Sequence, residues 1–163
     1  MLVLIWQSPE GLARLNLPVA AAQGESIEAA FVRMFPAYQR QLAAHKIAPN
    51  MPQVLTTDDK LPAEEWADAW AIHEGSVIVH LERAKMLVLQ RIKQEQVALR
   101  KPTDQAFAEA VEHGPKEKKI ALEQYRNALA MSFENSKAAL AQMTTLEEVA
   151  AYKPTWPAAP AKE

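Results

Sequence analysis

The sequence predicts an α+β fold, with a small N-terminal antiparallel or mixed sheet and one helix, then an α-helical hairpin region and an extended C-terminal tail. Short aliphatic runs separated by turn residues fill the first eighty positions, and the longest amphipathic pattern begins at His80. Pro and Ala dominate the last residues. These observations divide the chain into a head domain (1–80), a helical region (81–152) and a Pro-rich tail (153–163).

The chain opens with two short aliphatic runs, residues 2–6 and 12–17, on either side of Ser8-Pro9-Glu10-Gly11. Pro suits the second position of a turn and Gly tolerates positive φ, so this segment predicts a β-hairpin. Arg14 and Asn16 alternate with apolar residues, which gives the second strand a polar side and an apolar side.

One helix is predicted within the head. Ser26 is a suitable N-cap, since its hydroxyl can accept a hydrogen bond from a free backbone N–H of the first turn. Pro36 is expected to break or kink this helix. Its apolar side consists of Ile27, Phe31, Met34 and Phe35.

The head continues with a short candidate strand at 53–57 and a second hairpin. Trp70 and Ile72 alternate with less apolar residues, Glu74-Gly75 forms the turn, and residues 76–79 return. The head is therefore expected to contain four or five strands.

The chain is organised around the amphipathic helix at 80–101. Its apolar residues recur at steps of three, four or seven and so share one face; they are Leu81, Ala84, Val88, Ile92 and Leu99. Pro102 lacks an N–H donor and disfavours helical geometry before it, so the helix is predicted to end at Arg100 or Lys101.

Four more helical segments are predicted after Pro102. Thr103 is the expected N-cap of the first, which ends at Gly114-Pro115, and the second covers 116–131. A short third helix restarts at Asn135 or Ser136, and the last follows a capping box of Thr145 and Glu148. The segments 81–99 and 116–129 are predicted to pack antiparallel through their apolar stripes.

Composition narrows the chemistry. The 163 residues carry a formal net charge of −2 and no Cys, which excludes disulfides, thiolate metal sites and cysteine nucleophiles. No segment approaches the roughly 20 apolar residues that span a bilayer, so we expect no membrane association and a protein that is soluble and intracellular at synthesis.

No catalytic, cofactor-binding or metal-ligating residues are predicted, and the protein is not expected to be an enzyme. The four histidines include no pair at the i,i+4 spacing of a zinc motif, and there is no nucleophile elbow or Gly-rich phosphate loop. His73, His80 and Glu74 could meet across the second hairpin as a metal site. Polar residues of a hairpin and a helix boundary are the favoured interpretation.

Nucleic-acid binding is the weaker of the binding hypotheses. Six basic residues lie on the helix at 80–101, but they are spread around its polar arc without interleaved aromatics, so a solvated face is favoured. They are Arg83, Lys85, Arg91, Lys93, Arg100 and Lys101. The tryptophans Trp66, Trp70 and Trp156 are better candidates for partner contacts, although Trp156 could instead dock on its own helical region.

Together with the N-terminal hairpin, whose first strand carries Ile5-Trp6 before the turn, three stretches carry a resemblance to a known group of proteins. They are DDKLPAEEWADAWAIHEGSVIVHLERAK at 58–85, LEQYRNALAMSF at 122–133 and MTTLEEVAAYKPTWPAAP at 143–160. Together they resemble small tail proteins of tailed bacteriophages, and the last two resemble the carboxyl end of tail-fibre assembly chaperones, which have a Tyr-Arg helix and close on Trp-Pro.

The resemblance implies a phage tail-fibre or tail assembly protein that acts by protein–protein binding. Its partner would be a tail or tail-fibre protein, in a homo-oligomer or a hetero-complex, with contacts through Trp66, Trp70, Tyr125, Trp156 and Pro157. It would act in the host cytoplasm during assembly. The alternative is a structural subunit retained in the mature tail, at a fibre attachment or baseplate position.

Overall fold

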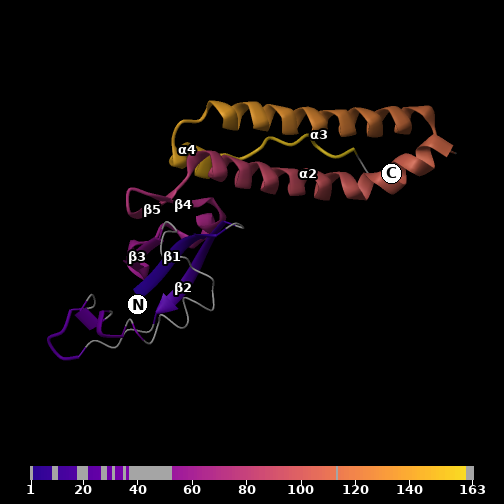
Figure 1. Cartoon of the computed structure of the whole chain (residues 1–163). Coiled ribbons are helices and arrows are strands. Elements are labelled where there is room, and N and C mark those ends of the chain that lie inside the picture. Colours follow the sequence, from indigo (N-terminus) through magenta and orange to yellow (C-terminus); the bar gives the residue numbers. More distant parts are fainter. Residues whose placement is uncertain are drawn as a thin grey trace. The chain divides into compact units, whose positions relative to one another are not determined.

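The computed structural model confirms the α+β class and divides the chain into two compact units, Met1–His80 and Leu81–Glu163 (Figure 1). It describes residues 2–8, 11–17, 22–26, 29–30, 32–34, 36, 53–112 and 114–160. The C-terminal tail belongs to the second unit.

The first sheet of the head has three antiparallel strands in the order β2-β1-β3. They are β1 (Leu2–Ser8), β2 (Gly11–Leu17) and β3 (Gln53–Thr57), and the hairpin and the third strand were both predicted. Successive side chains of a strand point to opposite faces. Because the four consecutive residues Val3, Leu4, Ile5 and Trp6 are all buried, the central strand is covered on both faces.

The second hairpin, β4 (Trp70–His73) and β5 (Ser76–Val79), also confirms the prediction. Glu74 and Gly75 have φ of 47° and 74°, the pair of positive values that a type I′ turn requires. Two short 3-10 helices precede it, η1 (Asp58–Lys60) and η2 (Glu64–Ala69). The His80 N–H donates to the carbonyl of Ala69 at 2.8 Å and fixes the chain beyond β5.

Ser26 is the helix N-cap that the sequence predicted, because its Oγ accepts the N–H of Ala29 at 3.1 Å. Residues 29–30, 32–34 and 36 are helical, so Pro36 itself has helical backbone geometry. Of the predicted apolar side, Met34 is half-buried, and the other three residues lie outside the described part of the chain.

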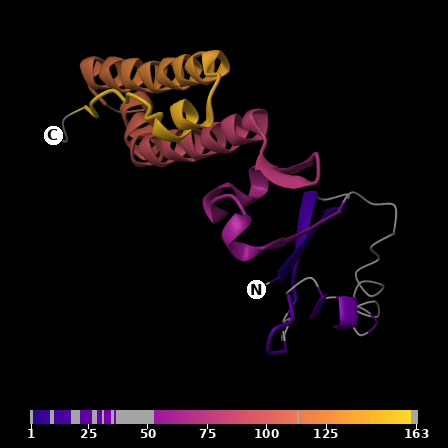
Figure 2. The same cartoon turned by 90° about the vertical axis from the view of Figure 1, so that its left-hand side faces the viewer.

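The second unit is an antiparallel hairpin of two long helices, α2 (Leu81–Glu112) and α3 (Lys116–Gln142), followed by α4 (Leu146–Ala151), which packs on α2 (Figures 1 and 2). The predicted antiparallel direction of the two helices is confirmed, but the predicted pairing of 81–99 with 116–129 is shifted. Gln96 meets Leu129 and Lys93 meets Phe133, so most of 81–99 lies beside the part of α3 that follows Leu129. The core of the hairpin is formed by buried side chains of both long helices, among them Ala84, Val88, Ile92, Leu122 and Leu129.

The predicted end of the first helix is wrong, since α2 continues through Pro102 to Glu112. Pro102 has no N–H donor, so the carbonyl of Ala98, four residues earlier, lacks its helical hydrogen bond. Thr103 lies inside the helix, and its hydroxyl donates to the Arg100 carbonyl at 2.7 Å instead of capping a new helix. Packing against α3 on both sides of Pro102 compensates for the lost hydrogen bond.

The predicted restart near Asn135 is also wrong, because α3 is continuous over 27 residues. Its segment contains no Pro or Gly. Ser136 is buried on the core side, and its hydroxyl donates to the Ser132 carbonyl at 2.7 Å, so this polar side chain is satisfied inside the helix.

The predicted capping box at α4 is confirmed. The Glu148 N–H donates to Thr145 Oγ1 at 3.2 Å. In return, the Glu148 carboxylate accepts the backbone N–H groups of Thr144 and Thr145 at 2.8 and 3.1 Å. These bonds hold the pKa of Glu148 below its usual value, with the Thr144 N–H as the largest cause.

Candidate partner-binding surface

Three of the residues predicted to contact a partner are buried within their own unit. Trp66 and Trp70 are 5% and 3% exposed in the head, and Tyr125 is 5% exposed in the helical hairpin. Because they are buried, these aromatic side chains are core residues. The structure gives no support to their role as partner contacts.

Trp156 and Pro157 lie on the surface of the second unit, in a tail that runs beside the helical hairpin from the end of α4 (Figures 1 and 2). Both side chains are half-buried. The indole Nε1–H of Trp156 donates to Glu95 Oε2 of α2 at 3.1 Å. The structure therefore places Trp156 on its own helices, the alternative that the sequence left open.

The tail packs with alternating side chains. Tyr152, Pro154 and Trp156 are half-buried, while Lys153 and Thr155 between them are exposed. Residues 152–160 have no regular secondary structure. The period of two is that of an extended chain with one side against a surface.

The tail contacts α2 at Glu95, and the buried Ala84 and Val88 lie on the same line of α2 toward its N-terminus. We call the line of Ala84, Val88 and Glu95 the tail flank. Separations of eleven and seven residues from Glu95 are close to whole turns, so the three residues lie on one line along the helix. Ala84 and Val88 are buried, and α4 packs on α2. The tail continues from α4 to Glu95.

The opposite side of α2 carries exposed apolar residues. Met86, Val97 and Val111 are 69%, 54% and 50% exposed. They lie nine residues before Glu95, and two and sixteen residues after it, so all three are about half a turn away from the tail flank. We call this line of three residues the open flank.

Several basic residues of the hairpin have partners within the chain. The Lys93 ammonium lies 4.7 Å from the centre of the Phe133 ring, and the Arg126 guanidinium lies 4.4 Å from that of Phe107. Asp104 accepts Arg100 and Arg126 at 3.2 and 3.3 Å. The sequence did not predict the aromatic partners, because each stands on the other long helix of the hairpin.

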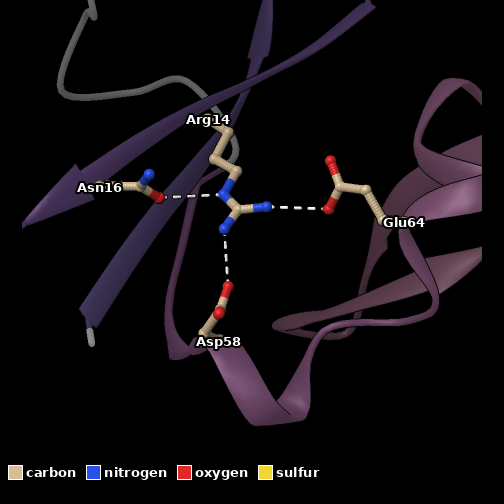
Figure 3. A network of polar contacts seen from close by, with 4 residues as sticks. All are labelled: Arg14, Asn16, Asp58 and Glu64. Atoms are coloured by element: carbon tan, nitrogen blue, oxygen red, sulfur yellow. Dashed lines mark hydrogen bonds and ion pairs between the residues drawn. The ribbon is translucent and has the colours of Figure 1, made fainter.

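In the head, Arg14 joins β2 to the segment that follows β3 (Figure 3). Its Nη2 and Nη1 donate to Asp58 Oδ1 at 2.6 Å and to Glu64 Oε2 at 2.9 Å, and its Nε donates to Asn16 Oδ1 at 3.0 Å. Arg14 and Asn16 share one side of β2, as predicted. The two carboxylates are 44 and 50 residues away in sequence, and no local pattern indicates them.

Of the residues considered as a metal site, His73 Nε2 lies 3.8 Å from Glu74 Oε1, and both side chains are exposed. Within the described ranges, no group of three or more His, Asp or Glu is arranged to hold a metal ion. No helix in the described part of the chain is long and apolar enough to span a membrane.

Comparisons of the chain with protein-family models, with curated proteins and with solved structures find no match.

Proposed function

We propose that this protein acts in the assembly of a phage tail or tail fibre, as a chaperone-like protein that binds a tail or tail-fibre protein and carries out no catalysis. The phage context rests on the resemblance of residues 58–85, 122–133 and 143–160. The binding mode rests on the helical hairpin of the second unit.

The observation that carries the proposal is the open flank of α2. Its three apolar side chains are each at least half exposed and are aligned over 25 residues, which corresponds to about 37 Å of helix. Met86, Val97 and Val111 lie eleven and fourteen residues apart, which corresponds to about 16 and 21 Å along the helix. They are therefore three separate apolar contact points on one side of α2, which an elongated partner segment can cover together. α4 and the tail lie on α2's other side, so the open flank is accessible in the isolated unit.

The test is co-purification with a phage tail-fibre protein, the partner that the proposal names. A triple variant, Met86→Ser, Val97→Ser and Val111→Ser, removes the three exposed apolar side chains of the open flank without touching the core. We expect it to bind the partner at least 30-fold more weakly, which corresponds to about 2 kcal/mol, the usual threshold for dominant contact residues.

A matched control uses exposed apolar residues of the other helix, Ile120→Ser with Met131→Ser, which should leave binding unchanged. Circular dichroism establishes that both variants keep their helices. Full binding by a folded triple variant, or no binding by the parent protein, would contradict the proposal. The structural-subunit alternative predicts instead a stoichiometric copy in purified virions.

A further inference from the structure

We infer that the tail flank of α2 is a binding site for an extended peptide carrying Trp followed by Pro, and that the chain's own tail is its resident, displaceable ligand. The inference rests on the proposed function, because the peptide that displaces this chain's own C-terminal tail would belong to the phage tail or tail-fibre protein. It adds a second site, distinct from the open flank, and states the chemistry of the segment that binds there.

The contact between the C-terminal tail and the helices has features of a peptide-binding site. Over residues 152–156, one side of the extended segment supplies the half-buried Tyr152, Pro154 and Trp156, and the other side, with Lys153 and Thr155, faces solvent. Pro residues at 154 and 157 restrict the unbound segment toward extended geometry, so little conformational entropy is lost on docking. Domains that bind Pro-rich segments in a groove benefit from the same small loss of conformational entropy.

Glu95 gives the site a preference for Trp over Phe. Its carboxylate accepts the indole N–H of Trp156 at 3.1 Å, a charge-assisted bond that Phe cannot make. Phe in place of Trp therefore keeps the apolar contact and loses the hydrogen bond. Positions equivalent to the exposed Lys153 and Thr155 are free to vary in a ligand.

The contact is suited to exchange. Trp156 is half-buried, in contrast to the buried Trp66 and Trp70 of the head, and residues 152–160 form no strand or helix that would have to unfold. A tether of this length supplies an effective concentration in the millimolar range, so the resident tail occupies the site until a competitor of higher affinity or multivalency arrives.

The experiment measures binding of a fluorescent peptide with the sequence of residues 152–160, YKPTWPAAP, to the full-length protein by anisotropy. The parent protein is compared with Trp156→Ala, whose resident tail is weakened. We expect saturable binding to Trp156→Ala and at least tenfold weaker binding to the parent. A peptide with Phe for Trp, and a Trp156→Ala protein that also carries Glu95→Leu, should each bind at least threefold more weakly.

Absence of binding to a helical Trp156→Ala protein would overturn the inference, as would equal binding of the Trp and Phe peptides. If Trp156→Ala is not helical by circular dichroism, Trp156→Phe serves as the weakened resident, with the same expected order of affinities. The assay contains no phage protein and does not involve the open flank. Its failure is therefore distinguishable from failure of the co-purification test.

Discussion

At the scale of single residues, Gln96 sets the alignment of the two long helices. Its side chain is buried, and its Nε2 donates to the main-chain carbonyl of Leu129 at 3.0 Å, while its Oε1 accepts the Lys93 ammonium at 2.8 Å. Apolar stripes tolerate sliding more readily than a buried hydrogen bond does. Gln96 therefore selects one register of α2 against α3.

We expect Gln96→Glu to lower the free energy of unfolding by about 1 to 2 kcal/mol at neutral pH, because a carboxylate replaces the donor that faces the Leu129 carbonyl. The Lys93 ammonium offsets part of the loss. Gln96→Met, of similar shape but without charge, should cost less than Gln96→Glu. Urea unfolding followed by helical circular dichroism measures both, and a Glu variant as stable as the Met variant would contradict this role.

Glu148 makes the cap of α4 dependent on pH. Its folded pKa lies below the usual glutamate value because the N–H groups of Thr144 and Thr145 donate to the carboxylate. The cap therefore contributes fully above the unfolded pKa, about 4.3, and its contribution is lost as pH falls through the lower folded pKa.

The expected result is faster hydrogen exchange in α4 as the pH falls below about 4, after correction for the intrinsic exchange rate. Glu148→Gln is the control, since a neutral amide can accept the same bonds and does not titrate. A pH response of the same size in both proteins would show that the carboxylate is not its source.

At the scale of elements, α2 shows how tertiary packing extends a helix past a proline. Pro102 is exposed and has no N–H, so the helix loses one hydrogen bond there. Beyond Pro102, Asp104 and Phe107 both contact Arg126 of α3. Ala110, further along α2, is buried.

We expect Pro102→Ala to raise the free energy of unfolding by about 1 to 3 kcal/mol, the range between a partly relaxed and a fully unfavourable proline in a helix interior. Chemical denaturation measures the change. Ala98→Gly tests the same turn in the opposite direction, with an expected loss of about 1 kcal/mol. A destabilised Pro102→Ala protein would mean that packing of α2 against α3 depends on the proline.

At the scale of the whole molecule, each of the two units has a buried core of its own, one around β1 and one between α2 and α3. Val88→Asp places a carboxylate in the second core, at a cost of several kcal/mol and comparable to the stability of a small domain. We expect it to unfold the helical hairpin.

Hydrogen exchange with mass spectrometry reads the two units separately in the same sample. In Val88→Asp, peptides from α2 and α3 should lose protection, while those from β1 and β3 keep it because their own core is intact. Val97→Asp, on the open flank, should keep protection everywhere. Unprotected strands in Val88→Asp would show that the head depends on the helical unit.

The local chemistry of the sequence determined the fold class, all five strands of the described part of the chain and the caps at Ser26 and Thr145. Each of these features depends on residues that are close in sequence. Alternation from Trp70 to Ile72 predicts a strand, Glu74-Gly75 predicts the turn, and a hydroxyl next to a free backbone N–H predicts each cap. Only the tertiary structure decided the rest. Helix α2 passes Pro102 because α3 anchors both sides of it, and Arg14 meets carboxylates some fifty residues away. Trp156 lies on Glu95 because a chain reversal brings the tail back to α2. Contacts between distant segments depend on how the helices and strands pack, and no local pattern records that packing.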